Sequence, residues 1–143
     1  MIYTPMTKKA MGIAFKAHDG QLDKAGLPYV NHPLHLAEQM DTEEECCVAL
    51  LHDVVEDTDW TLDDLRREGF SDEVIEGVDL MTHDPQVNYF DYVRQLAPNP
   101  IARKVKLADL DHNSDLSRLD EVTPYHLEKL GKYKEAKRIL IGE

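Results

Sequence analysis

Residues 48–57 read Val-Ala-Leu-Leu-His-Asp-Val-Val-Glu-Asp, an apolar segment that contains one imidazole and three carboxylates. These four polar residues form two pairs with a spacing of four, so a helix would place them within an arc of about 140°. They are His52, Asp53, Glu56 and Asp57. Leaving such a cluster dry and unpaired would cost several kcal/mol, whereas a divalent cation bound by histidine and carboxylate would remove that cost. The segment therefore predicts a buried helix that contributes to a metal site.

The rest of the chain contains the capping and turn residues that are typical of helices joined by short turns. The pairs Thr4-Pro5, Asn99-Pro100 and Thr123-Pro124 each place a polar cap before a proline, which is typical of a helix start. No alternating run of β-branched residues and no Asn-Gly or Asp-Gly hairpin turn stands out. We therefore expect an all-α helical bundle that forms a single domain over residues 1–143. The expected helices are 5–18, 33–40, 42–57, 62–68, 72–81, 88–96, 100–118 and 124–140.

Composition narrows the class of protein. With 42% hydrophobic residues in 143 positions, the chain has ordinary globular usage, and no apolar run reaches the ~18 residues of a membrane-spanning helix. The formal net charge of −12 argues against nucleic acid as a partner, because binding to phosphate backbones needs positive charge. No signal peptide is recognisable at the N-terminus, so we expect a cytoplasmic protein without membrane contact. Monomer and homo-oligomer both remain open.

Two further segments can complete the metal site. His32 precedes Pro33 at the point where a turn enters a predicted helix. Residues 106–113 read Lys-Leu-Ala-Asp-Leu-Asp-His-Asn on the predicted 100–118 helix. There three polar residues lie along the edge of an apolar stripe and can face a pocket. They are Lys106, Asp109 and Asn113.

The dipeptide His-Asp is weak evidence by itself, since it occurs at 18–19, 52–53 and 83–84. Only the second pair lies in an apolar helix with further carboxylates one turn on. The pair at 83–84 precedes Pro85 in a predicted loop, and we interpret it as part of a polar turn on the surface.

Taken together, three segments resemble the HD-domain metal-dependent phosphohydrolases, and among them the hydrolase domains of the RelA/SpoT type and the stand-alone small alarmone hydrolases. They are Pro-Tyr-x-x-His-Pro at 28–33, His-Asp followed by Glu-Asp-Thr at 52–58, and Lys-Leu-Ala-Asp-x-x-x-Asn at 106–113. The resemblance extends over residues 5–140 and implies the HD-domain helical fold. It implies one divalent metal ion, which is usually Mn²⁺ in this family. The implied ligands are His32, His52, Asp53 and Asp109.

The resemblance also implies a reaction and the residues that perform it. Relatives remove pyrophosphate from the 3′ oxygen of guanosine tetra- or pentaphosphate, so the implied partner is a small nucleotide substrate. Glu56 and Asp57 would position and deprotonate the attacking water. Lys24, Lys106 and Asn113 would contact the substrate.

The sequence departs from its relatives at two places, and these departures leave the identity of the substrate open. Residues 23–26 read Asp-Lys-Ala-Gly, where relatives have Arg-Lys-x-Gly with the arginine against the base. Asp111 and His112 stand where relatives often have a basic residue and an aromatic one. One alternative is therefore an HD phosphohydrolase that acts on another nucleotide, such as a nucleoside monophosphate or a 2′,3′-type ester. Another is a non-catalytic metal- or nucleotide-binding regulator, although such a protein would not need the adjacent Glu56 and Asp57.

Overall fold

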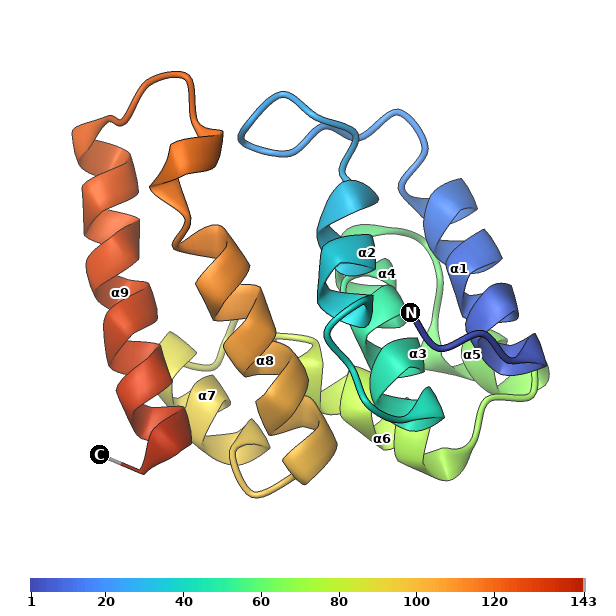
Figure 1. Cartoon of the computed structure of the whole chain (residues 1–143). Helices are drawn as coiled ribbons and strands as arrows, with labels where there is room; N and C mark the ends of the chain where they lie inside the picture. Colours follow the sequence, from blue (N-terminus) through green and yellow to red (C-terminus); the bar gives the residue numbers. More distant parts are fainter. Residues whose placement is uncertain (143) are drawn as a thin grey trace.

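The computed structural model describes residues 1–142, and its regular elements are helices (Figure 1). They are α1 (Pro5–Ala17), α2 (Asn31–Ala37), α3 (Glu43–Leu51), α4 (Val54–Asp57), α5 (Leu62–Arg67), α6 (Asp72–Met81), α7 (Tyr89–Leu96), α8 (Pro100–Asn113), the 3₁₀ helix η1 (Leu116–Arg118) and α9 (Pro124–Ile141). Among these residues, β-pairing is limited to an isolated bridge between Leu22 and Pro28. The all-α fold expected from the sequence is confirmed.

Helix α3 is the central element and packs against α1, α2, α6 and α8 (Figure 1). Every side chain from Cys46 to Leu51 is buried. A helix that is apolar on all sides is stable when other helices surround it. Its start is fixed by a capping box, because Thr42 Oγ1 accepts the N–H of Glu45 at 3.2 Å while the Glu45 carboxylate accepts the N–H of Thr42 at 3.2 Å. The buried helix predicted from residues 48–57 is therefore the core of the fold.

The predicted helix 42–57 is interrupted after Leu51, which corrects the continuous helix assumed from the sequence. His52 Nδ1 donates to the carbonyl of Ala49 at 2.6 Å, and a continuous helix would pair that carbonyl with the N–H of Asp53. The His52 side chain thus occupies the Ala49 carbonyl, and the helix cannot continue through Asp53. The chain then resumes as α4, with Asp53 at its N-cap (φ −102°, ψ −3°).

The predicted helix 100–118 also ends early, at Asn113. Asn113, Ser114 and Asp115 are poor helix formers because their short polar side chains compete for backbone groups. Asp115 Oδ1 accepts the N–H of Ser117 at 3.0 Å, and this bond begins η1. Helix α9 then returns beside α8, so the η1 segment lies at one end of this helix pair (Figure 1).

Helix α2 begins two residues before the expected 33–40 segment and ends at Ala37. Pro33 lies in its first turn, where a missing N–H costs no hydrogen bond. His32 is consequently part of the helix rather than of the turn before it. The other helices begin and end within one residue of the expected bounds.

The contact between α3 and α6 depends on a glycine. A Cβ at Gly77 would lie 2.8 Å from Val48 Cγ2, which is too close for two carbon atoms that are not bonded. We therefore expect Gly77→Ala to lower the free energy of unfolding by about 1–3 kcal/mol, because the two helices must move apart. Urea denaturation measures this change, and the double variant with Val48→Ala should recover part of the loss.

Gly12 provides the control for this prediction. It lies in α1 with open space around the position that a Cβ would take. Gly12→Ala should raise the free energy of unfolding by roughly 0.5–1 kcal/mol, because alanine suits a helix interior better than glycine does. A Gly77→Ala protein as stable as the wild type would show that α3 and α6 are not packed this closely.

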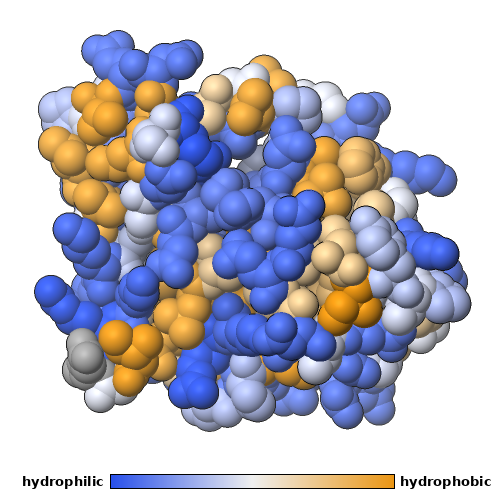
Figure 2. Space-filling model, viewed as in Figure 1, coloured by the Kyte–Doolittle hydropathy of each residue, from blue (hydrophilic) through white to orange (hydrophobic). Residues whose placement is uncertain are grey.

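The surface is mainly hydrophilic over the middle of the face shown in Figure 2. Hydrophobic atoms gather at the upper left, over the beginning of α9, where Val122 and Leu127 are exposed. None of the helices in residues 1–142 is both long enough and apolar enough to cross a membrane.

Candidate active site

Three helices bring two imidazoles and a carboxylate together in the interior. His32 comes from α2, His52 follows α3 and Asp109 comes from α8, and all three side chains are buried. One ligand atom of each lies within 4.8 Å of the others. His32 Nε2 is 2.8 Å from Asp109 Oδ1, and His52 Nε2 is 3.7 Å from the same oxygen. Residues 77 positions apart in the sequence therefore form one donor set.

The orientation of His52 leaves a lone pair facing acceptors. Its Nδ1 carries the proton, because it donates to the Ala49 carbonyl. Its Nε2 is buried without a hydrogen-bond partner, although Asp53 Oδ2 lies 2.9 Å away. Burial alone would lower the pKa of His52, but the carboxylates of Asp53 and Asp109 outweigh burial and raise this pKa well above its usual value. A proton or a metal ion must therefore lie between Nε2 and these oxygens, and the donor set suits a divalent metal ion.

His32 is oriented by a second histidine. Its Nδ1 lies 2.6 Å from His112 Nδ1, and the two rings are stacked with centroids 4.9 Å apart. Burial and the nearby charge of His32 lower the pKa of His112 to about 4. His112 is consequently neutral at neutral pH. Its contact with Nδ1 fixes the His32 ring with Nε2 toward Asp109, as the outer partner of a metal-bound histidine does.

Asp109 is held by two neighbours on its own helix. Lys106 Nζ donates to Oδ2 at 2.9 Å, and Asn113 Nδ2 donates to Oδ1 at 3.1 Å. Burial would raise the pKa of Asp109, but the ammonium of Lys106 and the imidazole of His32 outweigh burial and lower this pKa well below its usual value. Asp109 is therefore an ionised carboxylate. Lys106 and Asn113, expected to contact substrate, both contact this residue.

A second acidic group adjoins the first. Carboxylate oxygens of Asp53, Glu56 and Asp57 lie within 4.8 Å of one another, and the Tyr29 hydroxyl donates to Asp53. Glu56 Oε1 accepts the backbone N–H of His83 at 2.9 Å. Partial burial and the charge of Asp53 raise the pKa of both Glu56 and Asp57. A raised pKa makes these two exposed carboxylates better proton acceptors.

The two groups open into a cleft with a volume of about 240 Å³. Its lining combines carboxylates with lysines and tyrosines. The lining residues are Tyr29, Asp53, Glu56, Asp57, His83, Tyr89, Tyr92, Lys106, Asp109, Asn113, Lys132 and Tyr133. The ammonium of Lys132 lies 4.0 Å from the centroid of the Tyr89 ring, a cation–π contact that fixes this charge in the wall. The cleft therefore offers ligands for a cation beside donors for an anion.

Several lining residues lie outside the set expected from the sequence. The pair at 83–84 lies in a loop as expected, and Asp84 Oδ1 accepts the N–H of Gln86 at 2.9 Å. That interpretation missed that His83 also lines the cleft and that its N–H binds Glu56. Lys132 and Tyr133 of α9 carry no motif that could have identified them. Tyr29 belongs to the motif at 28–33, so this motif could have indicated its contact with Asp53. Lys24 lies beyond this cleft, with its Nζ donating to the carbonyl of Asn113 at 2.6 Å.

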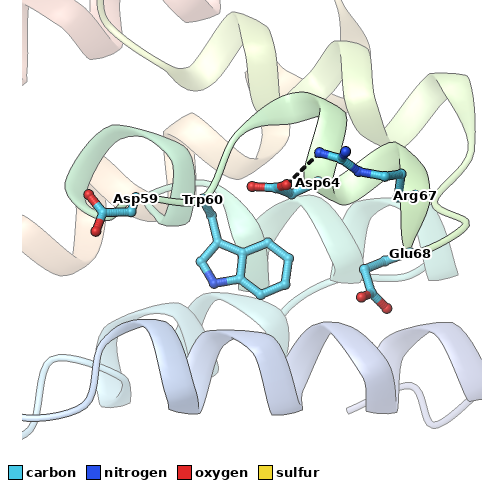
Figure 3. Close-up of a pocket in the computed structure, with 5 residues that line it drawn as sticks. All are labelled: Asp59, Trp60, Asp64, Arg67 and Glu68. Carbon is cyan, nitrogen blue, oxygen red and sulfur yellow. Dashed lines mark hydrogen bonds and ion pairs between the residues drawn. The ribbon is translucent and has the colours of Figure 1, made fainter.

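Another cavity, with a volume of about 440 Å³, lies beside α5 (Figure 3). The indole of Trp60 points toward α1, and the carboxylate of Asp59 points away from the indole. Arg67 Nη2 is paired with Asp64 Oδ1 at 2.7 Å, and Glu68 completes the lining. None of these five residues belongs to the imidazole–carboxylate groups, so the metal-binding chemistry lies in the other cleft.

Comparison with known proteins agrees with this geometry. A family model described as HD domain matches residues 10–108. The chain is 37% identical over 119 residues to the GTP pyrophosphokinase of Streptomyces coelicolor, covering 74% of this chain and 14% of that protein. It is 38% identical over 113 residues to the guanosine-3′,5′-bis(diphosphate) 3′-pyrophosphohydrolase MESH1 of Mus musculus, covering 71% of this chain and 62% of that protein. The chain thus spans less than two thirds of the length of either relative.

A solved structure extends the likeness to the whole fold. It belongs to a metazoan ortholog of SpoT, described as hydrolysing ppGpp. It superposes with a TM-score of 0.77 at 26% sequence identity and covers 99% of this chain and 89% of that chain. The likeness therefore includes α9 and the residues after 108, which the family model does not match. On the family match over more than half of its length, the chain belongs to the HD-domain family.

Proposed function

We propose that this chain is a metal-dependent hydrolase that removes the 3′-pyrophosphate of guanosine 3′,5′-bis(diphosphate), ppGpp, or of the corresponding pentaphosphate. The observation that carries the proposal is the adjacency of a buried imidazole–carboxylate set and a second, exposed carboxylate group in one cleft. The names of the relatives support the choice of substrate. The protein would act as one domain over residues 1–143, in the cytoplasm, on a small nucleotide.

The proposed metal ligands are His32, His52, Asp53 and Asp109. Their supporting contacts fit this role, because the Nδ1 atom of each histidine contacts a partner outside the set and its Nε2 atom faces the carboxylates. Two imidazoles and two carboxylates suit Mn²⁺, which is the ion we propose. When bound, the ion supplies Lewis-acid polarisation of a phosphoryl oxygen and lowers the pKa of a bound water.

The proposed proton acceptors for the attacking water are Glu56 and Asp57. Both are exposed to the cleft and adjoin Asp53, so a water at the metal set lies within their reach. Glu56 is held in place by the N–H of His83, and Tyr29 orients Asp53 through its hydroxyl. With a raised pKa, each carboxylate takes a proton more readily than an ordinary surface acid does.

The part of the cleft that α9 forms would bind the phosphates. Lys132 projects from α9 against the Tyr89 ring, and its charge remains free of any ion pair among residues 1–142. Lys106 is 8% exposed and bonded to Asp109, so it would act mainly by fixing that carboxylate. Asn113 serves Asp109 in the same way. Lysines on this side explain how a chain with a net charge of −12 can accept a polyanion.

The test is a substrate panel assayed with Mn²⁺. The purified chain should release pyrophosphate and GDP from ppGpp, and turnover should require the ion. Guanosine monophosphate and 2′,3′-cyclic guanosine monophosphate serve as the alternative substrates. Turnover of either one without turnover of ppGpp would contradict the substrate, and inactivity on the whole panel would favour a non-catalytic regulator.

Removal of the ion should also lower thermal stability. An ion bound only by the folded chain stabilises it by about 2.7 kcal/mol at a hundredfold excess over the dissociation constant, which is several degrees in Tm for a chain of this size. A thermal scan before and after treatment with a chelator measures the shift, and added Mn²⁺ should reverse it. An Asp109→Asn protein should show no response to the ion. An unchanged Tm in the wild type would contradict a site preformed as described.

A further inference from the structure

A smaller cavity continues the cleft beyond the metal set. Its volume is about 180 Å³, and it shares two lining residues, Tyr29 and Asn113, with the cleft. The lining residues come from the loop before α2, from α2, from the end of α8 and from η1. They are Asp23, Lys24, Tyr29, His32, Asn113 and Arg118. A ligand with one end at the metal set can therefore extend into this cavity.

Arg118 reaches the cavity because the predicted 100–118 helix ends at Asn113. Its side chain is 17% exposed, Nη1 lies 3.5 Å from Asp23 Oδ2, and Nη2 donates to the carbonyl of His112 at 3.0 Å. A guanidinium has five N–H donors. These two contacts leave three of the five without a partner among residues 1–142, and the buried Nε is one of them. The guanidinium is thus fixed in place and still has N–H groups that can donate to a ligand.

Asp23 is fully occupied and cannot turn toward a ligand. Its Oδ1 accepts the N–H groups of Ala25 and Leu27 at 2.8 and 3.0 Å, and its Oδ2 faces Arg118. The carboxylate is 8% exposed. It therefore shapes the loop before α2 and holds Arg118 against the wall of the cavity.

The lining of the cavity favours a flat ligand group that accepts hydrogen bonds. Asp23 offsets the charge of Arg118, and the ammonium of Lys24 donates to the Asn113 carbonyl. Partial burial and the charge of Arg118 lower the pKa of Lys24, so the two cations lie close enough to affect each other. The planar ring of Tyr29 forms another wall. A flat heterocycle with acceptor atoms along one edge fits these surroundings, because it can lie against the Tyr29 ring and accept N–H groups of Arg118.

We propose that Arg118 is a specificity-determining residue that reads the nucleobase, with Asp23 as its positioning residue. Guanine presents two acceptors, O6 and N7, on the edge that an arginine contacts with two donors, whereas adenine presents an amino group at the position of O6. Arg118 would therefore favour guanine over adenine. The inference rests on the proposed function, which places the scissile phosphate in the cleft and hence the base in the adjoining cavity.

The test measures binding rather than turnover. GDP, the product of the proposed reaction, and ADP are titrated calorimetrically into the full chain with Mn²⁺ present. The wild type should bind GDP at least about tenfold more tightly than ADP. Arg118→Ala should weaken GDP binding by about tenfold and leave ADP binding unchanged, so that the preference falls close to one. Arg118→Lys should not restore the preference, because a single ammonium lacks the two-pronged geometry of the guanidinium.

Two further variants separate recognition from folding. Asp23→Asn keeps an oxygen for the Ala25 and Leu27 N–H groups but removes the charge that holds Arg118, so the preference should fall in part. Arg94→Ala is the matched control, because Arg94 forms an exposed pair with Asp91 at 2.8 Å, and it should keep the wild-type preference. Thermal scans identify any variant that fails to fold, and Arg118→Gln then replaces Arg118→Ala.

The outcomes distinguish this inference from the proposed function. A wild type that prefers GDP and loses the preference with Arg118→Ala, yet releases no pyrophosphate from ppGpp, supports the inference and contradicts the function. A wild type that hydrolyses ppGpp but binds GDP and ADP equally overturns the inference alone. Unchanged preference in folded Arg118→Ala also overturns it.

Discussion

Asp109→Asn is expected to abolish stoichiometric metal binding and to lower hydrolysis by roughly 10³-fold, because metal-ion catalysis contributes several kcal/mol of transition-state stabilisation. Asp109 is the carboxylate that lies against both His32 and His52, so its loss removes the centre of the donor set. Asparagine keeps the size of the side chain. Alanine would in addition leave the buried ammonium of Lys106 without its partner, at a cost of about 3–5 kcal/mol in stability.

Metal analysis of the purified variant and an assay with Mn²⁺ measure the two effects. Asp111→Asn is the matched control, two residues along the same helix, since Asp111 is exposed and pairs with Lys137 at 2.7 Å. It should keep both metal and activity. If Asp109→Asn retains one equivalent of metal, the ligand assignment of Asp109 is wrong.

Glu56→Gln should keep the metal but lower kcat by about 10²–10⁴-fold, the usual contribution of a general base. The amide retains an oxygen that can accept the N–H of His83, so the local structure should persist. It cannot take a proton from water. Because Glu56 is outside the proposed ligand set, metal content and Tm should match those of the wild type.

Asp57→Asn, measured in parallel, shows which of the two carboxylates accepts the proton, since the larger loss in kcat marks the acceptor. Glu76→Gln on the exposed face of α6 controls for the removal of a surface charge. Full activity in both Glu56→Gln and Asp57→Asn would remove these residues from the mechanism.

Much of the fold follows from local chemistry. Thr4, Thr61, Ser71, Asn99 and Thr123 each cap a helix at the expected place, because an N-cap depends on the side chains of a few neighbouring residues. Helix bounds differ from expectation at α2 and, more strongly, where a side chain competes with the backbone, at His52 and at the run after Asn113. Such competition depends on small energy differences that a pattern of apolar residues does not contain.

The residues of the candidate site also differ in how far a local pattern could predict them. His52, Asp53, Glu56 and Asp57 could be predicted because they are close in the sequence, so they stay near one another although the helix is interrupted after Leu51. His32 and Asp109 could be named from their positions as residues able to complete the site, and their roles as ligands were implied by the resemblance of the motifs. The structure brings His32, His52 and Asp109 into one donor set, and their roles as ligands remain for the metal analysis to test.

The helical class, the central apolar helix and the imidazole and carboxylates that follow it can be derived from the sequence alone, because these depend on periodicity and spacing within single segments. Tertiary packing, by contrast, sets His112 against His32, Lys132 in the lining of the cleft and Arg118 beside Asp23. Asp23 and Arg118 are 95 residues apart, and their pairing follows from where α8 ends and how the loop before α2 folds. Contacts between distant segments are set by the packing of whole helices, which no local pattern specifies.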